Sequence, residues 1–68
     1  MTYKQAQEHS LTVPWRTFEC STPDCWCRGV VPVDPIEDED GNDVFIIPSG
    51  VVTKECAEHI VELHNKSL

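Results

Sequence analysis

Positive charge and long apolar runs are both scarce in this sequence. Its 68 residues include five lysine and arginine residues against twelve aspartate and glutamate residues, which gives a formal net charge of −7 at pH 7. Nucleic-acid binding requires a basic surface that neutralises phosphates, so we expect no direct contact with nucleic acid. No segment approaches the roughly 20 apolar residues that a membrane-spanning helix needs, so we expect no membrane contact either.

Short length limits what the chain can do. Its 68 residues suffice for one domain, and a domain near this size buries only about 60% of the surface that its unfolded chain exposes. Few such domains can enclose a substrate, and the G-x-S-x-G and H-E-x-x-H motifs are missing, so we predict that the protein is not an enzyme. The polar N-terminus does not resemble a secretion signal, which favours a cytoplasmic location.

The residue pattern predicts a small α+β domain with the element order β-β-β-α. Residues 1–11 are polar, and we expect them to form a flexible arm or a short helical turn before a single compact domain over residues 12–68. Three segments rich in β-branched and aromatic residues predict a three-stranded antiparallel sheet: residues 12–20, 25–33 and 44–47. Thr53 is a suitable N-cap for a C-terminal helix, which we expect to pack on one face of the sheet.

Prolines and a glycine indicate where the strands end. Pro32 has no N–H to donate, so the second strand either lies at an edge of the sheet or ends there. We expect the third strand to stop at Pro48. The Asp40-Gly41-Asn42 sequence predicts a chain reversal in the loop between them.

The spacing of three cysteines predicts that their sulfurs gather on one side of a hairpin. If residues 21–24 form the turn, Cys20 lies opposite Cys25. In the same register, Phe18 lies opposite Cys27. Alternate residues of a strand share a face, and directly opposed residues point the same way, so the three thiols lie together.

We expect the helix to cover this thiol side of the sheet. Val31 has the same parity as the hairpin thiols, which indicates that they face the core. The helix has an apolar stripe at i, i+4 and i+7, formed by Cys56, Ile60 and Leu63. This stripe would bring Cys56, with His59 beside it, over the hairpin thiols.

Four converging soft donors can hold a tetrahedral zinc ion. The candidate ligands are Cys20, Cys25, Cys27 and Cys56, with His59 as a substitute for one thiol. One structural zinc would stabilise a domain with a thin core. Two alternatives stay open: the reduced thiols pack as small apolar side chains, or Cys20 forms a disulfide with Cys25 or Cys27.

An acidic loop without a basic residue is a candidate contact surface. Its candidate binding residues are Glu37, Asp38, Glu39, Asp40 and Asp43. The spacing does not fit a calcium-binding EF-hand loop, because placing Gly41 at position six puts Ile36 and Ile47 at the ligand positions one and twelve. The loop is therefore either a solvated turn or a patch that attracts a partner with a basic surface.

Two tryptophans are candidate anchors for the same partner. Trp15 and Trp26 have the parity opposite to that of the thiols, and Arg28 shares it. Tryptophan and arginine are favoured anchors in protein interfaces. The alternative is that the two indoles pack against each other to shield the sheet.

Several of these residues resemble small orphan proteins of tailed bacteriophages, especially phages of actinobacterial hosts. The similarity covers roughly residues 12–66 and includes Trp15, the C-x4-C-W-C-R segment Cys20–Arg28, and a terminal helix that ends in Leu63-His64-Asn65. It implies a phage-encoded protein in the cytoplasm of an infected bacterium. Such proteins often bind a host protein and inhibit or redirect it.

Host-protein binding is accordingly the function that the sequence favours, with the acidic loop steering the encounter and Trp15, Trp26 and Arg28 as anchors. One alternative is a structural zinc module that contacts its partner through the hairpin. The other is a homodimer that forms through an exposed sheet face or an edge strand.

Overall fold

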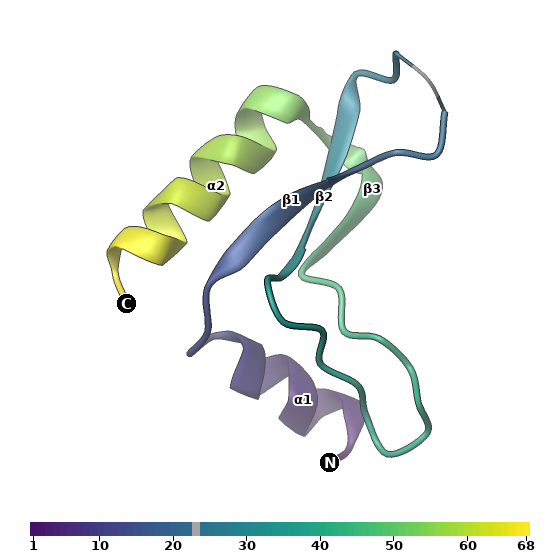
Figure 1. Cartoon of the computed structure of the whole chain (residues 1–68), viewed down its shortest axis with the longest axis vertical. Helices are drawn as coiled ribbons and strands as arrows, with labels where there is room; N and C mark the ends of the chain where they lie inside the picture. The colour runs from purple at the N-terminus through teal and green to yellow at the C-terminus, as the bar shows by residue number, and fades with distance from the viewer. Residues whose placement is uncertain (23) are drawn as a thin grey trace.

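A computed structural model describes residues 1–22 and 24–68, and it confirms an α+β fold with a three-stranded antiparallel sheet (Figure 1). The strands lie in the order β1-β2-β3. The elements in chain order are α1 (Tyr3–Ser10), β1 (Trp15–Glu19), β2 (Cys27–Pro32), β3 (Ile47–Thr53) and α2 (Lys54–Lys66). Neither helix in the described part of the chain combines the length and the apolar content needed to cross a bilayer.

Helix α1 is absent from the predicted order β-β-β-α, which is therefore incomplete. Its start is a capping box, in which Thr2 Oγ1 accepts from the Gln5 N–H (3.2 Å) and Gln5 Oε1 accepts from the Thr2 N–H (2.9 Å). Ala6 and Ser10 are buried, so one side of the helix packs on the rest of the domain. The T-x-x-Q pattern was the available sequence signal for this helix.

The β1–β2 register differs by two residues from the predicted one. Phe18 pairs with Gly29 and not with Cys27. A shift by one residue would exchange the two faces of the hairpin, but a shift by two preserves them. The connection between the strands is longer than predicted, and Cys25 lies in this connection outside strand β2.

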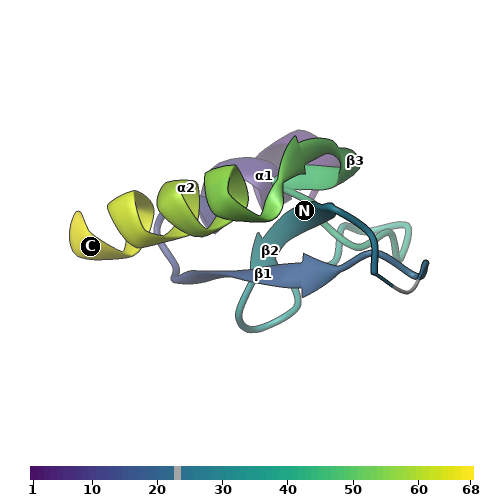
Figure 2. The same cartoon turned by 90° about the horizontal axis from the view of Figure 1, so that it is seen from above.

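Helix α2 packs on the face of the sheet that carries Trp15, and the prediction that it covers the thiol face is wrong (Figure 2). The core cluster consists of Trp15, Val30 and Ala57. Val30 and Cys27 differ in parity along β2, so the core and the Cys27 side chain belong to opposite faces. Both faces of β2 are apolar, and the helix covers the one that carries the large Trp15 side chain.

The orientation of α2 also differs from the prediction, although its N-cap is confirmed. Thr53 Oγ1 accepts a hydrogen bond from the Cys56 N–H (3.2 Å). The side that faces the sheet carries the fully buried Ala57 and the half-buried Ile60. Cys56 is exposed, and Leu63 keeps 55% of its surface in solvent. The predicted stripe was therefore rotated around the helix axis.

The end of α2 holds the start of β1 through an arrangement that we call the Trp15 clamp. The Trp15 ring stacks on His64 with a centroid distance of 3.5 Å, and His64 Nε2 donates to the Val13 carbonyl oxygen (2.7 Å). Asn65 accepts from the Trp15 N–H (2.9 Å) and donates to its carbonyl oxygen (3.0 Å), as a neighbouring strand would. The indole N–H donates to the carbonyl oxygen of Ser10 at the end of α1 (2.8 Å).

Strand β3 begins where the predicted third strand ended. It runs over Ile47–Thr53, through the Pro48–Gly50 segment that was expected to stop it. A register irregularity between Arg28 and Val30 and a positive φ of +92° at Gly50 accommodate this segment. Pro32 is the last residue of the central strand β2, so the strand ends there and the edge alternative is wrong.

A second, smaller apolar contact lies on the face of the sheet opposite to α2. The Phe18 ring crosses over Gly29, where a Cβ atom would overlap the ring carbons. Phe18 also contacts Phe45, with the ring centroids 5.7 Å apart. Gly29 is therefore required by close packing and not by its backbone angles.

Candidate metal centre

The hairpin brings three cysteine sulfurs together, as the sequence predicted. The Sγ atoms of Cys20, Cys25 and Cys27 all lie within 4.8 Å of one another, and those of Cys25 and Cys27 are 2.9 Å apart. Cys27 is 2% exposed at the start of β2, whereas Cys20 and Cys25 are half-buried. We call these three residues the thiol cluster.

Cys56 and His59 lie outside the thiol cluster, and the predicted four-ligand arrangement is wrong. Both residues are exposed on α2, which packs on the other face of the sheet. Within residues 1–22 and 24–68, no fourth cysteine, histidine or carboxylate joins the cluster. All four cysteines are free thiols in the structure.

Backbone hydrogen bonds fix the segment that carries the cluster. Arg28 Nη1 donates to the carbonyl oxygens of Cys25 (2.9 Å) and Cys27 (2.7 Å), so one guanidinium group holds both ends of the C-W-C segment. The Lys54 N–H donates to the carbonyl oxygen of Trp26 (3.0 Å), which ties the same segment to the start of α2. These three hydrogen bonds fix the backbone that carries Cys25 and Cys27.

Cys20 and Cys27 differ in acidity. The Thr22 N–H, which hydrogen-bonds the Cys20 sulfur, and the neighbouring Cys25 and Cys27 thiols lower the pKa of Cys20 from 9.0 to about 7. The hydrogen bond with Cys25, together with burial, raises the pKa of Cys27 from 9.0 to about 11. Near neutral pH Cys20 is therefore partly ionised, while Cys27 keeps its proton.

The separations of the sulfurs fit a shared metal ion. Zinc–sulfur bonds of about 2.3 Å in tetrahedral geometry place sulfur atoms about 3.8 Å apart. The Cys25–Cys27 separation of 2.9 Å is shorter than this value, and all three sulfurs lie within 4.8 Å of one another, so a shared ion requires only a small outward movement of this pair. Thiolate ligands favour soft or borderline ions such as Zn²⁺, and metal binding would displace the remaining thiol protons.

Two residues that contribute to the cluster were not identified from the sequence. The backbone N–H of Thr22 hydrogen-bonds the Cys20 sulfur and lowers its pKa, and the backbone N–H of Gly50 hydrogen-bonds the Cys27 sulfur and opposes part of the rise in its pKa. The short distance from Cys20 to Thr22 within a turn was a usable signal. Gly50 belongs to β3, so its approach to Cys27 depends on strand pairing and left no local signal.

The predicted aromatic contact surface is only partly present. Trp15 is 8% exposed and belongs to the core, so its predicted place on an exposed face is wrong. Arg28 is half-buried and its guanidinium group is engaged by the hairpin backbone. Trp26, at 60% exposure, is the member of the predicted set that projects into solvent, next to the thiol cluster.

The acidic loop is ordered by one of its own carboxylates. Asp38 accepts hydrogen bonds from the N–H groups of Asp40 (2.9 Å) and Asn42 (2.8 Å), and the Asn42 bond is the main reason that the pKa of Asp38 is lowered. With a positive φ of +81° at Gly41, this confirms the predicted chain reversal. The exposed acidic residues are Glu37, Glu39, Asp40 and Asp43.

The acidic loop and the hairpin connection lie at opposite ends of the molecule. Figure 1 shows the β1–β2 connection at one end of the long axis and the loop before β3 at the other, beside the N-terminus. The long axis measures 35 Å. The predicted contact residues therefore do not form one continuous surface.

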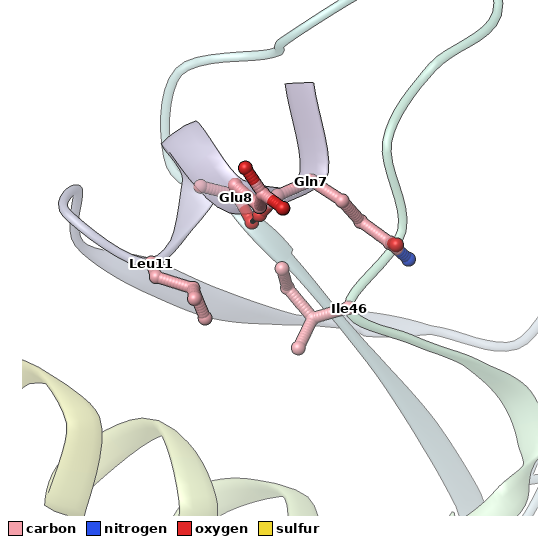
Figure 3. Close-up of a pocket in the computed structure, with 5 residues that line it drawn as sticks. Gln7, Glu8, Leu11 and Ile46 are labelled. Carbon is pink, nitrogen blue, oxygen red and sulfur yellow. Dashed lines mark hydrogen bonds between the residues drawn. The ribbon is translucent and has the colours of Figure 1, made fainter. Parts of the chain in front are cut away.

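Two shallow pockets lie away from the thiol cluster. One, of about 210 Å³, is bounded by α1 and the segment before β3, and Leu11 and Ile46 point toward the same space in Figure 3. The other, of about 130 Å³, lies on the Phe45 side, with Arg16 and Asp43 among its lining residues. No cysteine lines either pocket, so neither forms a substrate cavity around the thiols.

Comparisons with family models, curated proteins and solved structures gave no match to this chain. Its function is therefore inferred from its residues and their geometry.

Proposed function

We propose that this protein is a small protein-binding module whose β1–β2 hairpin holds one zinc ion. The ligands are Cys20, Cys25 and Cys27, and Trp26 is the contact residue beside them. The convergence of three sulfurs within 4.8 Å is the observation that carries the proposal.

Stability provides the physical reason for a metal at this position. The core cluster of Trp15, Val30 and Ala57 lies on the other face of the sheet from the thiol cluster, so this cluster does not pack on the thiols. A zinc ion bridging Cys20 to Cys25 and Cys27 would tie the end of β1 to the start of β2. Small domains commonly use a metal in this way.

Simple packing of reduced thiols explains the cluster less well. Buried cysteines behave as small apolar side chains, but Cys20 and Cys25 are only half-buried. Two backbone N–H groups also hydrogen-bond the sulfurs of Cys20 and Cys27. Such N–H groups stabilise thiolates and are typical of the surroundings of metal-bound sulfur.

Metal content and thermal stability test the zinc site. We expect one zinc per chain in the wild type and in Cys56→Ser, and little in Cys27→Ser, because Cys56 lies outside the cluster. Zinc in hundredfold excess over its dissociation constant should raise the free energy of unfolding by about 2.7 kcal/mol. A metal-free wild type whose melting temperature is unchanged by zinc and by a chelator would contradict the proposal.

The partner that we propose is a host bacterial protein, in line with the resemblance to small phage proteins. Exposed tryptophan is a common interface anchor, and Trp26 is 60% exposed. Trp26→Ala should weaken capture of the partner without changing zinc content. Equal capture by the wild type and by Trp26→Ala would remove Trp26 from the interface.

The acidic loop is a second candidate contact, favoured by its exposed carboxylates Glu37, Glu39 and Asp40. Such a loop steers a basic partner and affects the association rate more than the dissociation rate. Replacing these three residues by lysine should slow association and reduce its salt dependence, while leaving Asp38 to order the loop. An unchanged association rate would show that the loop takes no part.

A further inference from the structure

We propose that a metal ion held by the thiol cluster keeps one coordination position open, and that a thiolate sulfur from outside the cluster binds there. This inference rests on the proposed metal site and concerns what that site recognises. It assigns the protein a ligand class, namely thiols, in addition to a structural ion.

The open coordination position follows from the number of ligands that the chain supplies. Tetrahedral zinc takes four donors, and a site with three protein ligands leaves the fourth position to water or to an external ligand. The described part of the chain supplies three sulfurs and no further cysteine, histidine or carboxylate within reach. A structural site that is closed by this chain alone is therefore not formed.

The accessibility of the cluster places the open position toward solvent. Cys27 is buried, whereas Cys20 and Cys25 are half-buried and Trp26 between them is largely exposed. Helix α2 packs on the opposite face of the sheet and does not cover the sulfurs. An incoming ligand can approach from the side of Cys20 and Cys25.

A fourth thiolate matches the three sulfur ligands in softness, and the surroundings of the cluster offset part of its charge. Zinc with three thiolates has a net charge of −1, and a fourth thiolate makes it −2. The N–H groups that hydrogen-bond Cys20 and Cys27, and the Arg28 guanidinium on the backbone of Cys25 and Cys27, offset this charge. In the exchange the metal–water bond breaks, a metal–sulfur bond forms, and the thiol proton passes to solvent; no electrons are transferred.

Two sources of thiolate are chemically equivalent here. One is a small-molecule thiol. The other is Cys56 of a second copy of this chain, since Cys56 is exposed and separate from its own cluster. The second source would make the protein a metal-linked dimer.

Cobalt(II) in place of zinc makes the open position visible. The test uses the full chain with a phosphine reductant, adds 2-mercaptoethanol, and uses the thioether 2-(methylthio)ethanol as the matched control. If the position is open in the monomer, the sulfur-to-cobalt absorbance should rise saturably by about one third, because cobalt–sulfur bonds increase from three to four. The thioether should leave the absorbance unchanged.

A second arm separates the two sources. If Cys56 of another copy fills the position, the cobalt form sediments as a dimer without added thiol, and Cys56→Ser becomes a monomer that then responds to 2-mercaptoethanol. If small thiols are the ligand, the wild type and Cys56→Ser are both monomers and respond equally. A monomer whose cobalt spectrum is unmoved by thiol would overturn the inference.

Failure of the metal site itself has a different signature. In that case no sulfur-to-cobalt absorbance develops before thiol is added, or the absorbance persists in Cys27→Ser. A normal cobalt spectrum that does not respond to thiol leaves the metal site intact and removes only the open position.

Discussion

The Trp15 clamp and the thiol cluster hold the two ends of strand β1 by different means. At the Trp15 clamp, the indole is buried and stacked, and both backbone groups of Trp15 are hydrogen-bonded by Asn65. At the thiol cluster, the buried Cys27 and the half-buried Cys20 and Cys25 lie on the face that α2 leaves open. The Trp15 clamp is formed entirely by groups of this chain, whereas the thiol cluster has no fourth metal-ligating side chain from the described part of the chain.

Under the proposed function, this difference separates the end of β1 that the chain's own packing holds from the end that a bound metal would hold. The Trp15 clamp joins α1, β1 and α2 through a few large contacts. The hairpin connection at the far end carries the exposed Trp26 and the half-buried thiols of Cys20 and Cys25. Changes at the Trp15 clamp should therefore affect folding with or without metal, and changes at the thiol cluster should affect metal binding and the stability that the metal adds.

The largest expected effect is a difference in the free energy of unfolding between variants of the two tryptophans. Trp15→Ala removes the centre of the core and should lower the free energy of unfolding by about 3–5 kcal/mol. Trp26→Ala removes an exposed side chain and should change it by less than about 0.5 kcal/mol. Chemical denaturation of both variants measures the contrast, and equal losses would contradict the assignment of the core to the Trp15 side.

A smaller loss of stability is expected from the amide of the Trp15 clamp. Asn65→Ala removes two hydrogen bonds to the Trp15 backbone and should cost about 2 kcal/mol. Its affinity for zinc should equal that of the wild type, because the cluster lies at the other end of β1. If Asn65→Ala lost zinc but kept its stability, the assignment of stability to the Trp15 clamp and of zinc binding to the thiol cluster would be contradicted.

Arg28 provides the matching test at the thiol cluster. Arg28→Ala frees the carbonyl oxygens of Cys25 and Cys27, and loss of such a support typically weakens metal binding by about tenfold or more. Competition with a chromophoric chelator measures the zinc affinity. Arg16→Ala is the control, since Arg16 lies in β1 away from the sulfurs; equal affinity of both variants would show that Arg28 does not position the ligands.

The weakest effect is a pH dependence of the metal-free protein. Folding lowers the pKa of Cys20 from 9.0 to about 7, so its contribution to stability is lost as the pH falls through 7 and is full above 9. Folding raises the pKa of Cys27 to about 11, so its contribution is full below pH 9 and is lost as the pH rises through 11. Denaturation between pH 7 and 11 should show a maximum near pH 9, and Cys20→Ser should remove the rise between 7 and 9.

Local patterns predicted the parts of the fold that depend on neighbouring residues. Thr53 as the N-cap of α2 and the reversal at Gly41 are set by hydrogen bonds within a few residues. The thiol cluster was also predictable, because a two-residue error in register leaves the sulfurs of Cys20 and Cys27 on the same face.

Features that depend on distant contacts could not be predicted in this way. Both faces of β2 are apolar, so the sequence did not indicate that α2 would choose the Trp15 side. Because α2 packs on the Trp15 side, Cys56 is exposed to solvent and does not reach the thiol cluster as the expected fourth ligand. The roles of His64 and Asn65 also depend on β1, some 50 residues away along the chain.

X-ray absorption at the zinc edge tests the central claim, that the hairpin thiols bind a metal, most directly. The account predicts at least three sulfur neighbours at about 2.3 Å from zinc in the wild type and in Cys56→Ser, and fewer in Cys27→Ser. A shell of nitrogen and oxygen atoms alone, at about 2.0–2.1 Å, would place the metal at histidines or carboxylates and contradict it.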